Sequence, residues 1–266
     1  MRLIKIDELE PWYSRNPFVI GGYRNPKSPV KAFLSVFEWH NETLNIYSHF
    51  LPGLIWLYMS FSCANEEYYL LTEPFLRYLI HFSYAAAAFM GFCSAFAHTF
   101  YIVDQKWHDM CWKLDFVGII VINITHQILD TYILLYMYPT LFHVALSMQG
   151  IFSTLCIYDV ITEKTKINWG IVYPIMASTV LTIPAAISAY SQSSVILHFI
   201  SNCSIGCSIL VCIAGGVFYI GKIPERIWNP RGILDNFNSH VWFHLTIVAS
   251  LICAFRSVPY LHMVTS

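Results

Sequence analysis

Two histidines stand four residues apart in His240-Val-Trp-Phe-His244, at the start of the last apolar stretch of the chain. One helical turn separates residues at this spacing, so both imidazoles would lie on one face of a helix and could hold a metal ion together. The chain has 11 histidines, and one such pair is weak evidence by itself. Further ligating side chains close to the pair in space would make it part of a metal site.

His98 and Asp115 lie at the ends of two other apolar segments, and Ser94 precedes His98 by about one helical turn. Three histidines with an open fourth position are typical of catalytic zinc sites, in which a bound water has a pKa of about 7. A carboxylate beside that water can accept its proton, and a hydroxyl can bond a ligand carbonyl or the water. We therefore predict a Zn²⁺ site with metal ligands His98, His240 and His244 and with catalytic residues Asp115 and Ser94.

In a second interpretation, these residues bind no metal ion. His98 and the pair would then be polar side chains that snorkel to the headgroup interface, and Asp115 would be a favourable charge at a helix N-terminus. Ionisable residues inside membrane segments are costly and suggest function, which favours the metal site. The other histidines are expected to pack or lie at an interface, and His40, His49 and His108 are expected near the cytoplasmic face without a partner.

The composition indicates which elements carry these residues. The chain is 56% hydrophobic and only 12% charged, about half the charge of ordinary soluble domains, which predicts a multi-pass membrane protein. The net charge of -1 says nothing about partners, and no nucleic-acid partner is expected. Eight scattered cysteines without a C-x-x-C motif are expected to be packing residues.

Runs of roughly 20 apolar residues are long enough to cross the hydrocarbon core as helices. The sequence has seven: 46–64, 76–101, 114–137, 140–160, 169–190, 195–219 and 239–262. We therefore expect an all-α membrane protein with seven transmembrane helices. Its domains would be a cytoplasmic N-terminal region at 1–45, a seven-helix domain at 46–262 and a short tail at 263–266.

The 15 basic residues predict the orientation of these segments. Six precede the first, two lie between the second and third, two between the fourth and fifth, and three between the sixth and seventh, whereas only Arg77 and Arg256 fall on the other side. The positive-inside rule then places the N-terminus in the cytoplasm and the C-terminus outside or in a lumen. In this orientation the three candidate ligands and Asp115 share the cytoplasmic third of the membrane.

Several segments together resemble the progestin and adipoQ receptor family in order and spacing. They are residues 16–24 (NPFVIGGYR), 41–49 (NETLNIYSH), 94–98 (SAFAH), 113–118 (KLDFVG), 222–226 (KIPER) and 239–244 (SHVWFH). The resemblance covers the chain from about residue 16. It implies seven helices with a cytoplasmic N-terminus, zinc on His98, His240 and His244, and Asp115 and Ser94 near the bound water. The wider group includes alkaline ceramidases and haemolysin III-like proteins.

Two functions follow as hypotheses. The first is a zinc-dependent amide hydrolase that cleaves a ceramide-like membrane lipid, releases a free fatty acid and takes part in lipid signalling. The second is a non-catalytic receptor or scaffold, with an unidentified signalling ligand, in which zinc only ties helices together. Either protein would be an integral membrane protein, and the sequence does not distinguish the plasma membrane from the endoplasmic reticulum or Golgi.

Overall fold

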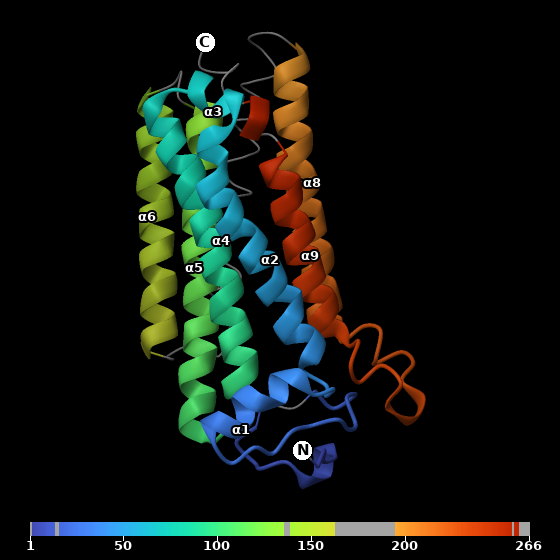
Figure 1. Ribbon diagram of the computed structural model, residues 1–266. Coiled ribbons are helices and arrows are strands. Elements are labelled where there is room, and N and C mark those ends of the chain that lie inside the picture. The colour runs from blue at the N-terminus through green and yellow to red at the C-terminus, as the bar shows by residue number, and fades with distance from the viewer. Residues whose placement is uncertain (1, 14–15, 136–138, 163–194, 257, 261–266) are drawn as a thin grey trace. The chain divides into compact units, whose positions relative to one another are not determined.

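The computed structural model describes residues 2–13, 16–135, 139–162, 195–256 and 258–260, and these residues form helices joined by loops (Figure 1). The described part contains no strand, only an isolated bridge between Ile4 and Tyr23. Its α-helices are α1 (Pro29–Leu34), α2 (Thr43–Ser62), α3 (Glu67–Leu71), α4 (Pro74–Phe100), α5 (Gln105–Leu135), α6 (Pro139–Thr162), α8 (Val195–Gly221) and α9 (Ser239–Phe255).

Six of the seven predicted spans coincide with helices, and the one predicted at 169–190 lies outside the described residues. By length and composition, three described helices can cross a membrane: Pro74–Phe100, Gln105–Tyr132 and Pro139–Val160. The last helix ends at Phe255, earlier than the predicted 262, and a short 3-10 turn follows at Val258–Tyr260. The predicted all-helical class is therefore confirmed for the described residues, and the count of seven stays a prediction.

The helix α5 begins at Gln105, nine residues before the predicted start of the third span. The Asp104 carboxylate accepts a hydrogen bond from the backbone N–H of Trp107 at 2.9 Å, and the Asp104 carbonyl accepts one from His108 at 2.9 Å. Asp is a favoured N-cap because its side chain satisfies a free N–H of the first turn. Asp115 consequently lies ten residues inside the helix and not at its N-terminus.

The chain divides into two compact units. Unit 1 comprises Met1–Gly53, Gly91–Asp115 and Ser208–Leu251, and unit 2 comprises Leu54–Met90, Phe116–Cys207 and Ile252–Ser266. All predicted site residues belong to unit 1.

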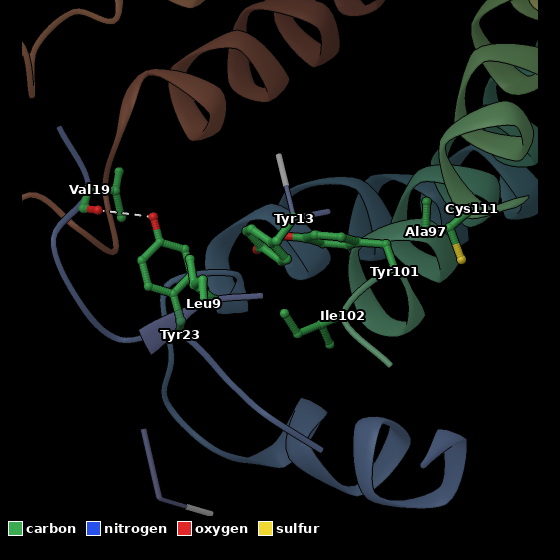
Figure 2. Packing of buried hydrophobic residues seen from close by; sticks show 8 residues of the cluster. All are labelled: Leu9, Tyr13, Val19, Tyr23, Ala97, Tyr101, Ile102 and Cys111. Atoms are coloured by element: carbon green, nitrogen blue, oxygen red, sulfur yellow. Dashed lines mark hydrogen bonds between the residues drawn. The ribbon is translucent and has the colours of Figure 1, made fainter. Parts of the chain in front are cut away.

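In unit 1 the N-terminal segment packs on the end of α4 and the start of α5 through a cluster of buried apolar side chains (Figure 2). The cluster consists of Leu9, Tyr13, Val19, Tyr23, Ala97, Tyr101, Ile102 and Cys111. The hydroxyls of Tyr13 and Tyr101 hydrogen-bond each other, and the Tyr23 hydroxyl donates to the Val19 carbonyl at 3.0 Å. Buried tyrosines need such partners because an unpaired hydroxyl in an apolar site is costly.

Arg24 fixes the N-terminal segment to the C-terminal end of α4. Its guanidinium donates to the carbonyls of His98 at 2.7 Å and Thr99 at 3.3 Å, and to the Ser35 hydroxyl at 2.8 Å. The last carbonyls of a helix lack partners within the helix, and a cation is favourable there. Arg24 therefore holds the backbone of a predicted metal ligand.

Two acids in the loop between α8 and α9 bind the same N-terminal segment. Asp235 accepts hydrogen bonds from the backbone N–H groups of Ile20 at 3.1 Å and Gly21 at 2.7 Å. Glu225 accepts one from the Asn16 amide at 2.8 Å. Residues 16–24 thus contact both the helix that carries His98 and the loop that leads to His240 and His244.

The helices α2 and α4 approach closely at Gly91. A Cβ atom there would lie 2.7 Å from the His49 carbonyl oxygen and 3.1 Å from the Gly53 Cα. Small residues at helix interfaces allow such backbone contact. This contact places the start of α2 against the part of α4 that carries Ser94 and His98.

Unit 2 has its own aromatic packing and its own buried polar contacts. The ring of Phe255 lies 4.3 Å from that of Tyr84 and 5.1 Å from that of Trp56, centroid to centroid. The Gln149 amide on α6 donates to the Thr131 hydroxyl of α5 at 2.5 Å. Such interhelical bonds from glutamine help to hold membrane helices together.

Candidate metal centre

The position of the histidine pair depends on how α9 begins. The buried Glu225 carboxylate accepts hydrogen bonds from the Ser239 N–H at 2.7 Å and from the Ser239 hydroxyl. The Asn238 side chain accepts one from the His240 N–H at 3.0 Å. These bonds satisfy N–H groups that the first turn leaves free, so the helix starts immediately before the pair. The two imidazole rings then lie 4.7 Å apart, centroid to centroid, as the spacing predicts.

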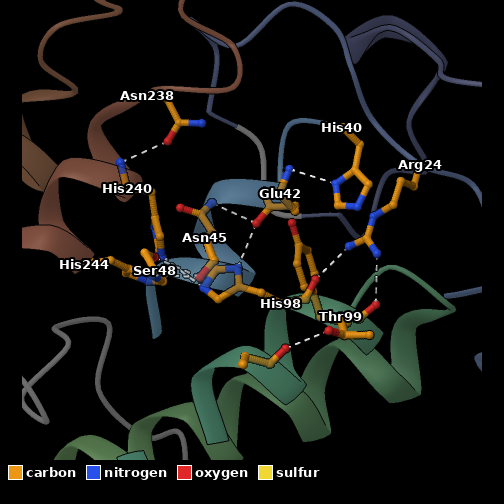
Figure 3. A network of polar contacts seen from close by, with 12 residues as sticks. Arg24, His40, Glu42, Asn45, Ser48, His98, Thr99, Asn238, His240 and His244 are labelled. Carbon is orange, nitrogen blue, oxygen red and sulfur yellow. Dashed lines mark hydrogen bonds and ion pairs between the residues drawn. The ribbon is translucent and has the colours of Figure 1, made fainter. Parts of the chain in front are cut away.

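His98 at the end of α4 meets this pair (Figure 3). Its Nε2 atom lies 3.2 Å from the Nε2 atom of His240. His98, His240 and His244 each offer a ring nitrogen, and these atoms lie within 4.8 Å of one another. The structure therefore brings together three ligands predicted from two distant segments, and His98 and His244 are buried at 3% and 2% exposure.

Glu42, one residue before α2, contacts the Nδ1 atom of His98, on the side of the ring away from the other two histidines. Its carboxylate lies 2.8 Å from His98 Nδ1 and accepts a hydrogen bond from the Asn45 amide at 2.8 Å. Burial by itself raises the pKa of the Glu42 carboxyl, but the hydrogen bond and charge of His98, with smaller contributions from His240 and Asn45, lower it to about 2. A carboxylate at this place keeps the proton of His98 on Nδ1 and leaves Nε2 free to bind a metal.

His244 is oriented by the first turns of α2. Its Nδ1 atom lies 3.0 Å from the Ser48 hydroxyl and 3.2 Å from the Asn45 carbonyl oxygen. The ring of His49 stacks on it at 3.7 Å between centroids with an interplanar angle of 6°. Because the carbonyl can only accept a hydrogen bond, the proton is on Nδ1, and Nε2 is again the free atom.

One distance within the group matches the geometry of a tetrahedral metal ion. Zinc–nitrogen distances of about 2.0–2.1 Å and tetrahedral angles require ring nitrogens about 3.3 Å apart. The separation of 3.2 Å between the Nε2 atoms of His98 and His240 agrees with this value. Two histidines have their second nitrogen held by a carboxylate or a carbonyl, the usual arrangement behind metal ligands. The buried group could therefore hold a metal ion.

Asp115 and Ser94 lie beside this group without belonging to it. Asp115 is buried, with 7% of the residue exposed, and its carboxylate lies next to the Ser94 hydroxyl and within electrostatic reach of His98. The Ser94 hydroxyl is buried and has no hydrogen-bond partner of normal geometry among the described residues. The alternative interpretation expected Asp115 at a helix N-terminus, which is wrong because Asp115 lies well inside α5. His98 and His244 are buried within the protein.

Sequence reasoning assigned no role to Glu42, Asn45, Ser48 and His49. It was wrong in expecting no partner for His40, which contacts Ser35 and Glu42, and for His108, which contacts Asp109 and Trp112. The ring nitrogens of His49 have no hydrogen-bond partner among the described residues, but its ring stacks on that of His244. The available signal was the density of polar residues in 41–49, at the start of an apolar segment.

A cavity of about 100 Å³ adjoins the histidine group. Its wall combines the N-terminal segment with residues of α4, α5, α8 and α9 and includes His98, His240 and Glu42. His240, unlike the other two candidate ligands, is only partly buried.

The model of the family described as "Haemolysin-III related" matches residues 37–255, which include every residue of the histidine group. The chain belongs to the haemolysin-III related family. The ADIPOR-like receptor IZH2 of Saccharomyces cerevisiae is 25% identical over 97% of this chain and 83% of its own length. The heptahelical transmembrane protein 3 of Arabidopsis thaliana is 23% identical over 93% and 83%, and the membrane progestin receptor alpha-B of Danio rerio is 34% identical over 42% and 31%.

These relatives confirm the resemblance to progestin and adipoQ receptors. Together with helices that are apolar enough to cross a membrane, they show that this haemolysin-III related chain is a receptor-like, multi-pass integral membrane protein.

Proposed function

We propose that the chain crosses the membrane seven times, with its N-terminus in the cytoplasm and its C-terminus outside or in a lumen. Six helices at predicted spans support this topology. So does the excess of lysine and arginine in the N-terminal region and the loops that would face the cytoplasm. The histidine group would then lie near the cytoplasmic face.

The metal of this site would be Zn²⁺, held by His98, His240 and His244. Imidazole ligands suit zinc, and three protein ligands leave a coordination position open, as in catalytic sites. A structural site normally has four protein ligands, and in the described part of the chain the group contains three. This count is the observation that carries the proposal of an enzyme.

The reaction would be hydrolysis of the amide bond of a ceramide-like membrane lipid, with release of a free fatty acid. When bound, zinc supplies Lewis-acid activation of water and of a carbonyl oxygen. Asp115 would accept the proton of the attacking water, and the buried Ser94 hydroxyl beside it would bond the carbonyl oxygen of the lipid. Glu42 would keep the tautomer of His98 that binds metal.

A receptor or scaffold without catalysis is the second candidate. It is favoured by the names of the relatives, an ADIPOR-like receptor and membrane progestin receptors. In that protein, zinc would only tie α4 to α9, and a signalling ligand of unknown chemistry would act on the helices.

The substitution Asp115→Asn tests the enzyme. Purified wild type should contain about one zinc per chain and release fatty acid from ceramide. The variant should keep its zinc and lose roughly a hundred- to ten-thousand-fold in turnover, because an amide cannot accept the proton. Asp109→Asn is the matched control, since Asp109 is an exposed acid of the same helix.

Zinc content and fatty-acid release are measured on the same preparations. Equal turnover by wild type and Asp115→Asn would remove the catalytic role. Absence of hydrolysis by zinc-loaded wild type across ceramides of different chain length would favour the receptor or scaffold.

A further inference from the structure

The cavity beside the histidine group contains a cation in an unusual backbone conformation. Lys222 follows Gly221, the last residue of α8, and has a φ angle of 53°. This left-handed region favours glycine, and strained residues of other types cluster at functional sites. The Lys222 side chain is half-buried and lines the cavity, with its ammonium 4.3 Å from the centroid of the Tyr219 ring.

The ammonium of Lys222 is within electrostatic reach of Glu225 but forms no ion pair with any described residue. The Glu225 carboxylate is instead engaged by Ser239 and Asn16. A half-buried cation without a close counter-ion is costly, so an anion that enters the cavity would gain a charged partner.

Neutral polar groups lie in the same wall. Asn41 is buried at 2% exposure, and it lines the cavity together with Tyr219. Within the part of the chain that the structure describes, the Asn41 side-chain amide and the Tyr219 hydroxyl make no hydrogen bond. The Glu42 carboxylate also lines the cavity, but its interactions are with His98 and Asn45. The groups left for a ligand are therefore one cation and two neutral hydrogen-bonding groups.

We propose that this cavity binds an oxyanion, the phosphate or carboxylate headgroup of a lipid, with Lys222 as the charged contact and Tyr219 and Asn41 as neutral donors. A space of about 100 Å³ holds several waters or a group of a few heavy atoms, which suits a phosphate. Binding of the headgroup does not require the proposed hydrolysis. The inference rests on the proposed function only where it assumes that the amide bond of the bound lipid reaches the histidine group. It narrows the substrate class to anionic amide-linked lipids.

The test compares the binding of ceramide 1-phosphate with that of neutral ceramide of the same chain length. The full chain, loaded with zinc in lipid nanodiscs, carries Asp115→Asn so that neither lipid is consumed. The phosphorylated lipid should bind about tenfold more tightly or better, the usual effect of a charge-assisted hydrogen bond. Lys222→Asn should abolish this preference, and Lys222→Arg should retain it.

Lys222→Asn is chosen because asparagine tolerates a left-handed backbone, so the fold should survive. Lys27→Asn is the matched control: Lys27 has a φ angle of 54° but is exposed and lies outside the cavity wall. The control should keep the full preference for the phosphorylated lipid.

Equal affinity of the parent protein for the two lipids would overturn the proposal, as would an unchanged preference in Lys222→Asn. If inorganic phosphate binds as tightly as the phosphorylated lipid, the lipid assignment is wrong and the site serves a soluble oxyanion. Failure of the wild type to hydrolyse any lipid, with the preference intact, would contradict only the proposed amidase.

Discussion

The side chains behind the metal ligands are the most informative residues of this protein. Glu42 and the Asn45 carbonyl each contact the Nδ1 atom of a different histidine, which leaves the Nε2 atoms of His98 and His244 free. A carboxylate or carbonyl behind a histidine ligand orients the ring and raises its basicity. The local chemistry of the site therefore depends on α2 as much as on the helices that carry the ligands.

Glu42→Gln should weaken metal binding by about 10- to 100-fold, since the neutral amide no longer stabilises a metal-bearing His98. Competition with a chromogenic zinc chelator measures the affinity. The exposed Glu38, four residues earlier, provides the control Glu38→Gln, which should bind zinc as the wild type does. Similar affinities for both variants would show that Glu42 does not support the ligand.

His40 should make stability depend on pH. Burial first, and then the charge of Arg24, lower the pKa of the His40 imidazole from 6.5 to about 4. Between these values the unfolded chain binds a proton that the folded chain does not, so stability is full above pH 6.5 and is lost as the pH falls toward 4. In metal-free protein, the melting temperature of the wild type should fall more steeply over this range than that of His40→Gln. Parallel curves would contradict the assignment.

At the scale of elements, close backbone contact between α2 and α4 decides whether the site forms. The contact at Gly91 and the capping of α9 by Glu225 and Asn238 set where the three ligand-bearing turns lie. The helix contact depends on a small residue inside an apolar segment, and the cap depends on polar residues before one.

Gly91→Ala should destabilise the protein by about 1–3 kcal/mol, because the new methyl group would lie 2.7 Å from the His49 carbonyl oxygen. Gly216→Ala is the matched control, since a Cβ atom there meets no described atom within 4 Å. Alanine in that helix should be neutral or stabilise by up to about 1 kcal/mol. Thermal unfolding in detergent gives both values, and equal melting temperatures of the two variants would refute the close contact.

At the scale of the whole molecule, the proposed topology places the N-terminal segment, α1 and the loop between α8 and α9 in the cytoplasm. If the protein resides in the plasma membrane, a tag at the N-terminus should resist protease in intact cells and a tag at the C-terminus should be cleaved. In that case, selective permeabilisation should expose the N-terminal tag. If it resides in an internal membrane, sealed vesicles expose their cytoplasmic face, so the N-terminal tag should be cleaved and the C-terminal tag protected. Cleavage of the N-terminal tag in intact cells, or its protection in sealed vesicles from an internal membrane, would reverse the orientation and move the site away from the cytoplasmic side.

Periodicity and composition alone were enough to predict several features of this protein. The spacing of His240 and His244 predicts their shared face, because helix geometry is local. Long apolar runs predict helices, since backbone groups in lipid must be satisfied within the segment. His98, Asp115 and Ser94 could be proposed because polar residues in such segments are rare and costly.

Tertiary structure alone decided which groups support the ligands. Glu42 reaches His98 across 56 positions of sequence, and Ser48 reaches His244 across 196. These contacts follow from the way the start of α2 packs beside α4 and α9, which no local pattern encodes. The place of Asp115 within α5 likewise depends on the cap at Asp104, a polar residue that hydropathy assigns to a loop. Contacts between helices depend on how side chains from distant segments fit together, so they are decided only in the folded chain.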